Sequence, residues 1–218
     1  MARRRIAVLG AGGFAREVRW LIEEIDAASP SFEFAGYVVG DRSRPGPHDV
    51  TEGILGDEAW LLENPGRVDA LAIGTGNPKL RLKIAAALAA AFPEDRWPAL
   101  VHPGVRMDRR SATVEPGAVV CAGAVGTVNV VLRAFSMVNL CCTLGHECEI
   151  GRGSALNPTV NVSGGVRLGA GVLVGTGAQI LENLSVGDGA TVGAGAVVTR
   201  DVAAGLTVVG APAKPLVR

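Results

Sequence analysis

The sequence predicts two domains of different class: an α/β domain over residues 1–100 and an all-β solenoid over residues 101–218. Strand and helix patterns alternate in the first part, which is typical of a parallel sheet with crossover helices. After Pro103, an aliphatic residue recurs at every sixth position, which indicates a repeat architecture. Glycine accounts for 30 of the 218 residues, about twice the usual share of ~7%, whereas aromatic residues make up only 4%. This composition suits many tight turns around a thin core of small aliphatic side chains.

The first domain carries three strand signals and two helix signals in the order β-α-β-α-β. The predicted elements are a buried strand at Arg5–Leu9, an amphipathic helix over 15–25, a strand at Phe32–Val39, a strand at Ala70–Ile73 and a helix over 80–92. Asn77 and Pro78 suit the N-cap and the first position of the second helix. Because of its prolines and glycines, the segment 41–57 is expected to be an exposed loop. The order of elements predicts a small parallel sheet with right-handed crossovers.

The second domain shows a period of six. From Val114 to Val198, fourteen of the fifteen residues at this spacing are Val, Leu or Ile, and the exception is Gly126. We call these the phase residues. The residue four places after each of them is small or aliphatic, and glycine recurs one place after at 145, 151, 169, 175, 187 and 193. Each six-residue unit is expected to form one side of a triangular coil, so that the span makes five coils of 18 residues. The phase residues should point to the axis, and the glycines should take turn conformations that a Cβ opposes.

Charge and hydropathy exclude several classes of partner. The 21 basic and 21 acidic residues cancel, which leaves no electrostatic footprint for nucleic acid or an anionic membrane. No apolar run approaches the ~18–20 residues of a membrane helix. The apolar run after Arg5 ends at Gly10, too soon for a signal peptide, so a cytoplasmic protein is expected. The four cysteines have no metal-ligand spacing, so we expect small core thiols and no metal site, with a metal site or a nucleophilic thiol as alternatives.

A glycine-rich loop connects the first strand to the first helix, which is the context of a phosphate-binding turn. Its candidate binding residues are Gly10, Gly12, Gly13 and Phe14. The acidic residue at the end of the second strand is Asp41, 31 positions after Gly10 rather than ~20, which argues against a dinucleotide. A mononucleotide or a nucleotide sugar fits better, and Gly76 and Asn77 border the same crevice. A tight turn without a ligand remains the alternative.

The sequence contains three histidines, and His146 is the main candidate for catalysis. His48 lies in the predicted loop and His102 at the domain junction, where a structural contact is the simpler interpretation. His146 follows the inward-facing Leu144 by two positions, so it should point outward near a corner, beside Glu147. A neutral imidazole can accept a proton from an amine or a hydroxyl that attacks a thioester. A solvated surface histidine is the alternative.

The segment from Asn139 to Gly151 resembles the catalytic segment of the sugar acyltransferase family. That family contains the sialic acid O-acetyltransferases and the UDP-4-amino-sugar N-acetyltransferases. Residues 208–214 are similar to its C-terminal signature and residues 10–18 to its N-terminal loop. The resemblance implies a Rossmann-like domain that binds a nucleotide sugar, followed by a left-handed parallel β-helix. The period of six does not by itself determine the handedness.

The resemblance also implies roles for individual residues. It implies that His146 is the general base, that Glu147 orients or tunes it, and that Asn139 lies near the acceptor. Asp41 and Arg42 match positions that contact the nucleotide. The donor implied is acetyl-CoA, held between the solenoids of a homotrimer, and the matching positions are Gly164, Thr176, Ala194 and Lys214. Many members carry a second histidine nine residues after the first, where this chain has Ala155.

The predicted function is therefore acetyl-CoA-dependent N-acetylation of a nucleotide-linked amino sugar. O-acetylation of a sialic-acid-like sugar or another small hydroxylated acceptor is the nearest alternative. A nucleotide-dependent oxidoreductase, suggested by the glycine loop alone, and a non-catalytic solenoid that binds partners stay open as further hypotheses.

Overall fold

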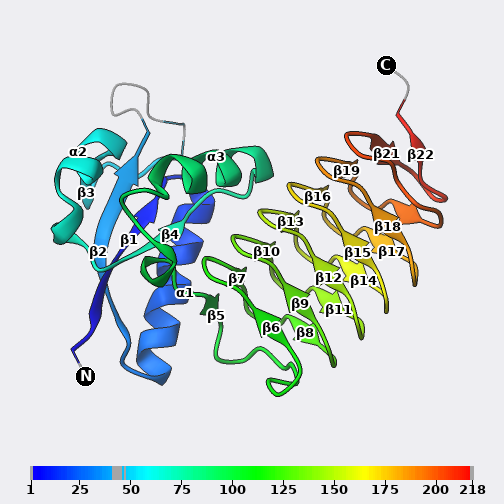
Figure 1. Ribbon diagram of the computed structural model, residues 1–218, viewed down its shortest axis with the longest axis horizontal. Helices are drawn as coiled ribbons and strands as arrows, with labels where there is room; N and C mark the ends of the chain where they lie inside the picture. Colours follow the sequence, from blue (N-terminus) through cyan, green and yellow to red (C-terminus); the bar gives the residue numbers. More distant parts are fainter. Residues whose placement is uncertain (1, 41–45, 47, 217–218) are drawn as a thin grey trace.

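The computed structural model describes residues 2–40, 46 and 48–216. Figure 1 shows a sheet with flanking helices, in blue to green, followed by a β-helix that runs from green to red. The α/β domain sits at the N-terminal end of the β-helix, and the chain ends at the last coil. This confirms the predicted fold class.

The first domain contains a four-stranded parallel sheet in the order β3-β2-β1-β4. The strands are β1 (Arg4–Leu9), β2 (Phe32–Val39), β3 (Ile54–Asp57) and β4 (Ala70–Ile73). The three predicted strands are confirmed. The prediction of a loop over 41–57 is wrong at its C-terminal end, because β3 pairs with β2 as an edge strand. The pattern of β3 is too weak to be detected beside the preceding prolines and glycines, because only Ile54 and Leu55 of its four residues are large and apolar.

Three α-helices and two 3₁₀ turns complete this domain. They are α1 (Gly13–Ala28), α2 (Glu58–Glu63), η1 (Pro65–Arg67), α3 (Pro78–Leu88) and η2 (Glu94–Arg96). The predicted start of α3 is confirmed, since the Asn77 side chain accepts a hydrogen bond from the Leu80 N–H at 3.1 Å. The helix ends at Leu88 rather than at Phe92, and turns follow it in which the N–H groups of Ala91 and Phe92 donate to the Leu88 carbonyl.

The second domain consists of two-residue strands stacked into three parallel sheets, which we call sides 1, 2 and 3. Side 1 contains β5 (Leu100–Val101), β7 (Val119–Val120), β10 (Met137–Val138), β13 (Ala155–Leu156), β16 (Leu173–Val174), β19 (Thr191–Val192), β21 (Thr207–Val209) and the antiparallel β22 (Lys214–Pro215). Side 2 contains β8 (Val125–Gly126), β11 (Thr143–Leu144), β14 (Asn161–Val162), β17 (Gln179–Ile180) and β20 (Val197–Val198). Side 3 contains β6 (Thr113–Val114), β9 (Val131–Leu132), β12 (Glu149–Ile150), β15 (Arg167–Leu168) and β18 (Ser185–Val186). The first corner leads from side 1 to side 2, the second from side 2 to side 3, and the third from side 3 back to side 1.

The register confirms the period. Leu144 pairs with Val162 and Ile150 with Leu168, each 18 residues or one coil apart. The β-helix extends beyond the predicted five coils at both ends, where the spacing changes. Val101 pairs with Val120 at a separation of 19, and Val186 bridges Val202 at a separation of 16.

The one glycine among the phase residues has a structural explanation. A Cβ built on Gly126 would lie 3.0 Å from Cγ and Sδ of Met107, which belongs to the longer first coil. The Met107 side chain packs against the solenoid core at this level. It therefore takes the place of the aliphatic side chain that Gly126 lacks, as a flexible thioether readily does.

The expectation about the recurrent glycines is wrong in its physical cause. The corner residues with positive φ lie three places after the phase residues, and they include Gly117, Gly123, Asn129, Phe135, Cys141, Glu147 and Thr159. The glycines one place after are needed because neighbouring coils approach closely there. A Cβ on Gly175 or on Gly187, for example, would lie 2.5 Å from a backbone nitrogen of the next coil.

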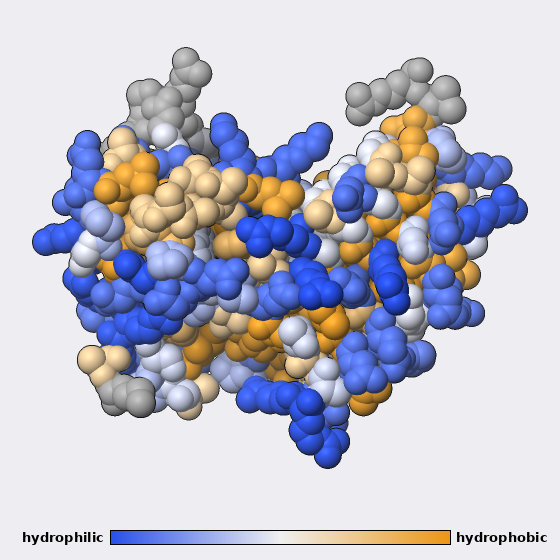
Figure 2. All heavy atoms as spheres, viewed as in Figure 1, coloured by the Kyte–Doolittle hydropathy of each residue, from blue (hydrophilic) through white to orange (hydrophobic). Residues whose placement is uncertain are grey.

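The α/β domain packs on side 1 of the first coils. The outward-facing Val119, Met137 and Ala155 are buried in one apolar cluster with α1 and the sheet, whereas Leu173 in a later coil is only half-buried. Figure 2 shows the corresponding hollow between the α/β domain and the last coils. The apolar interface therefore sets the position of the α/β domain relative to the first coils.

Replacing either of two buried serines, which lie at equivalent positions of the third corner, by alanine is expected to change the stability in opposite directions. Ser154 Oγ donates to the Gly169 carbonyl at 2.7 Å and accepts from the Val172 N–H at 2.9 Å. For Ser136 Oγ, which is equally buried, no partner lies within reach among the described residues. Ser136→Ala should raise the unfolding free energy by about 1 kcal/mol, since it removes an unpaired buried hydroxyl, and Ser154→Ala should lower it by about 1–2 kcal/mol. Denaturant unfolding of both variants checks this, and equal effects would contradict it.

Candidate active site

His146 lies at the second corner and points away from the core. Leu144, two residues earlier, is 2% exposed, whereas the His146 side chain is 66% exposed. The ring lies over the next coil, because a Cβ built on Gly164 would be 2.5 Å from its Cε1 and Nε2 atoms. The predicted outward orientation is confirmed, and the absence of a side chain at Gly164 leaves room for the ring.

The His146 ring is oriented by two side chains of the same corner. Its Nδ1 atom contacts Oε2 of Glu147, and the Asn129 amide donates to Oε1 of Glu147 at 2.9 Å. The Asn129 amide, and after it the His146 ring, hold the pKa of the Glu147 carboxyl below its usual value. An ionised Glu147 favours the tautomer with the proton on Nδ1. Nε2, which lies over Gly164, then carries the free lone pair and can accept a proton.

Asn129 was not among the predicted site residues. It precedes Glu147 by 18 residues, or one coil, and both adopt positive φ, at 55°. Asparagine tolerates this conformation better than most residues. Aligning the sequence at a period of 18 rather than six would have placed Asn129 beside Glu147.

The contact between Glu147 and His146 predicts that removing the Glu147 charge lowers the turnover rate. Glu147→Gln should lower kcat by about 10-fold, because a neutral amide stabilises an imidazolium less and can donate its own N–H to Nδ1. The melting temperature should stay unchanged, since the side chain is more than half exposed. Steady-state kinetics checks this, with the exposed Glu63→Gln as the control. An unchanged kcat would show that Glu147 does not assist His146.

Asn139 lies at the first corner, across side 2 from His146. It is 8% exposed, and its Oδ1 accepts from the Leu140 N–H at 2.7 Å. Thr176 and Ala194 also lie at the first corner, in later coils, whereas Gly164 lies at the second corner next to His146. The predicted catalytic residues, together with Gly164, Thr176 and Ala194, are thus divided between two corners of one chain.

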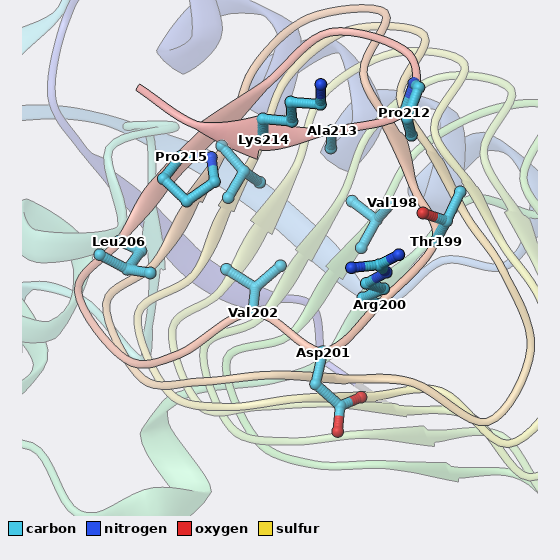
Figure 3. A pocket seen from close by; sticks show the side chains of 11 residues that line it. Val198, Thr199, Arg200, Asp201, Val202, Leu206, Pro212, Ala213, Lys214 and Pro215 are labelled. Carbon is cyan, nitrogen blue, oxygen red and sulfur yellow. The ribbon is translucent and has the colours of Figure 1, made fainter. Parts of the chain in front are cut away.

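Lys214 lies on β22 at the C-terminal end, beside a cavity of about 270 Å³. Figure 3 shows Arg200 and Thr199 on one side of this cavity, Lys214 and Pro215 on another, and the Asp201 carboxylate pointing away from it. Asp201 instead accepts a hydrogen bond from the Ser185 backbone. The two cationic side chains near this cavity make it a candidate region for a negatively charged group.

The glycine loop forms at the carboxyl edge of the sheet. Gly10 has φ 113°, and a Cβ there would lie 3.2 Å from the Gly74 carbonyl oxygen. Gly12 is the N-cap of α1, so free backbone N–H groups of its first turn lie at this edge. The loop after β4 brings Gly76 and Asn77 to the same edge, where the sequence places the crevice.

Other predicted residues of this crevice are placed differently or lie outside the description. Phe14 is half-buried against the core of the α/β domain. Asp41 and Arg42 lie outside the described residues. Asp49, which was not predicted, lies beside the loop: a Cβ on Gly12 would be 3.3 Å from its Oδ1.

His102 and the buried thiols of Cys121, Cys142 and Cys148 have contacts or burial that suit a structural role. His102 Nε2 lies 3.2 Å from Glu24 of α1, and its Nδ1 accepts from the Gly104 N–H. Burial raises the pKa of the Cys121 and Cys148 thiols to about 12 and that of Cys142 to about 11, so these thiols stay protonated.

Within residues 2–40, 46 and 48–216, no three His, Cys, Asp or Glu side chains group as metal ligands. Nor does any helix in that part of the chain have the length and apolarity to span a membrane.

Comparison with known proteins identifies the family. Residues 165–200 match the family model "Bacterial transferase hexapeptide (six repeats)". No curated protein matches the chain. The acetyltransferase domain of PglB from Neisseria gonorrhoeae FA1090 is 33% identical, with a TM-score of 0.84 over 98% of this chain and 100% of that one. WeeI from Acinetobacter baumannii AYE is 27% identical, with a TM-score of 0.81 over 97% of this chain and 99% of that one.

A third solved structure, PerB from Caulobacter crescentus in complex with CoA and GDP-perosamine, shares the fold. It is 24% identical, with a TM-score of 0.83 over 99% of each chain. The repeat, the two-domain architecture and the PglB match agree. This chain therefore belongs to the hexapeptide-repeat sugar acyltransferases, enzymes in which a Rossmann-like domain precedes a left-handed parallel β-helix.

Proposed function

We propose that this protein transfers an acetyl group from acetyl-CoA to the amino group of a nucleotide-linked amino sugar, with His146 as the general base. The observation that carries the proposal is the orientation of the imidazole. Its Nδ1 contacts Glu147, and its Nε2 lies over Gly164 of the next coil in a side chain that is 66% exposed. The PglB acetyltransferase domain, 31% identical in its complex with acetyl coenzyme A, supports the donor.

The chemistry follows from this geometry. The sugar amine attacks the thioester carbonyl, a C–N bond forms, and His146 Nε2 takes the proton that the nitrogen loses. The C–S bond then breaks, and the imidazolium returns the proton to the departing CoA sulfur. Glu147 stabilises the imidazolium while it exists, because it is ionised and in contact with Nδ1.

The division of the site between two corners supports a homotrimer. A second copy that packs its first corner against the second corner of this chain would bring Thr176 and Ala194 to Gly164 and His146. Four exposed apolar side chains lie on side 2 or at its corners: Val125, Val128, Leu140 and Leu181, which are 36–44% exposed. A surface of this kind suits burial against another copy. The donor groove is thus proposed to form between subunits, with Lys214 near the CoA phosphates.

The α/β domain, residues 1–100, is proposed to hold the acceptor. Its crevice offers the backbone of Gly10, Gly12 and Gly13 at the start of α1, a 16-residue helix whose N-terminus favours phosphate. Asp41, Arg42, Gly76 and Asn77 complete the proposed site. The β-helix, residues 101–218, would then present His146 and the donor. A cytoplasmic location is part of this proposal, since free thiols persist in a reducing compartment.

A screen of acceptors tests the proposal. Thiol release from acetyl-CoA is measured with UDP-, GDP- and dTDP-linked amino sugars and with the matching hydroxyl sugars. Release with at least one amine, and the mass of an N-acetyl product, are expected. Release with hydroxyl sugars alone would make the protein an O-acetyltransferase. No release above hydrolysis with any acceptor would overturn the proposed function.

A further inference from the structure

Arg81 of α3 is a buried cation that the proposed reaction does not use. Its side chain is fully buried, and in the described part of the chain it forms no ion pair. Burial lowers the pKa of its guanidinium to about 10, which still leaves it charged at neutral pH. A buried cation without a carboxylate is costly unless hydrogen bonds satisfy its donors. The partners of these donors therefore indicate the role of the residue.

The guanidinium donates to backbone carbonyls of both domains. Nη1 donates to Ile73 and Thr75, at 3.2 and 2.8 Å, where β4 of the α/β sheet ends. Nε donates to Phe135 at 2.9 Å, at the third corner of the β-helix, and Nη2 lies 3.5 Å from the Ser136 carbonyl. The rigid planar fork of an arginine constrains the distance and the orientation of the groups it joins. One side chain thus links the end of β4 to a corner of the β-helix.

Both linked segments lead directly to parts of the proposed active site. The end of β4 continues into Gly76, where a Cβ would lie 3.8 Å from Cε and Sδ of Met137 on side 1. This loop therefore rests on the β-helix. Residues 135–136 lead along the chain into β10, the first corner and then β11, which ends at Leu144 just before His146.

We propose that Arg81 is a positioning residue that sets the acceptor crevice of the α/β domain relative to the catalytic coil. The inference rests on the proposed function, because it requires the acceptor to bind at the end of β4. Leu82 supports the same contact: a Cβ on Gly153 would lie 2.5 Å from its Cδ2, so α3 is seated on the third corner. Leu82 supplies packing, whereas Arg81 supplies directed hydrogen bonds to both domains.

Kinetics of Arg81→Met and Arg81→Lys test this role. Arg81→Met should raise the KM for the nucleotide amino sugar, or lower kcat, by about 10-fold or more, since the crevice and His146 lose their relative position. The KM for acetyl-CoA should change less than about twofold, because the donor groove is proposed to lie between the β-helices of two subunits, without the α/β domain. Arg81→Lys keeps the charge but loses the planar guanidinium, so its effect on KM or kcat should lie between those of the wild type and Arg81→Met. It replaces Arg81→Met in the test if that variant does not fold.

Leu61→Ala is the matched control. Leu61 is fully buried on α2, which lies at the outer edge of the sheet, away from the β-helix (Figure 1). This variant should lower the melting temperature and leave both KM values unchanged. Equal kinetic effects of Leu61→Ala and Arg81→Met, or unchanged kinetics in Arg81→Met, would overturn the inference.

Hydrogen exchange gives a readout that does not depend on activity. Arg81→Met should speed amide exchange in residues 73–77 and 135–138 together, whereas Leu61→Ala should not change these two segments selectively. Exchange that changes equally over the whole α/β domain would overturn the inference. A wild-type protein that is inactive with every acceptor would overturn the proposed function, whereas an active wild type with unaltered Arg81 variants would overturn only the role of Arg81.

Discussion

Replacing His146 by alanine is expected to lower kcat by about 10²–10⁴-fold, the usual effect of losing a general base. The side chain is 66% exposed, so the fold and the melting temperature should be unchanged. Without the imidazole, the nitrogen of the tetrahedral intermediate can lose its proton only to water. Thiol release at saturating acetyl-CoA and acceptor measures the effect.

His102→Ala is the control for this experiment. His102 lies near Glu24 at the domain junction and should leave kcat within about twofold of the wild-type value. A near-normal rate in His146→Ala would remove this residue from the mechanism. A loss of the same size in both variants would indicate a general structural effect.

Gly164→Ala is expected to lower kcat by at least about 10-fold without unfolding the protein. The added methyl group would lie 2.5 Å from Cε1 and Nε2 of His146, so the ring must rotate away from its position. A small displacement of a catalytic group is enough for a loss of this size or more. Because the clash involves an exposed side chain, the coil can relax. The ratio of kcat values and a melting curve measure the two effects.

Gly187→Ala distinguishes displacement of the ring from damage to the coil. A Cβ at Gly187 meets the backbone of Ala204 in the next coil, which cannot move aside, so this variant should mainly lose stability. If Gly164→Ala instead lowered the melting temperature as much as Gly187→Ala and kept its kcat, the assigned position of the imidazole would be wrong.

The elements predicted best are those in which equivalent residues recur at a fixed spacing because they make the same contact. The six-residue period predicted the β-helix because each phase residue contacts the same core. The pattern of a strand, glycines and a helix predicted that α1 begins at the carboxyl edge of the sheet. Edge strand β3 was missed because only two of its four residues are apolar, whereas β4, of the same length, is apolar throughout. Met107 was missed because it fills the space at Gly126 from a coil with an extra residue.

The contacts of the His146 side chain were predicted only where its partner is a neighbour in sequence. His146 and Glu147 are adjacent, and their pairing follows from the corner. Asn129 and Gly164 reach His146 through the stacking of coils, so only an alignment by coil places them there. Arg81 donates to the backbone carbonyls of Phe135 and Ser136, which follow it by 54 and 55 positions. Every residue has a backbone carbonyl, so such a partner cannot be recognised from the sequence.

The proposed role of His146 is tested most directly by a crystal structure with CoA and a nucleotide amino sugar bound. The sugar nitrogen should lie within about 2.6–3.2 Å of Nε2 of His146, or one water away, with the CoA sulfur on the far side of the acyl position. A complex in which both ligands are bound but the nitrogen and the sulfur lie remote from the second corner would contradict this role.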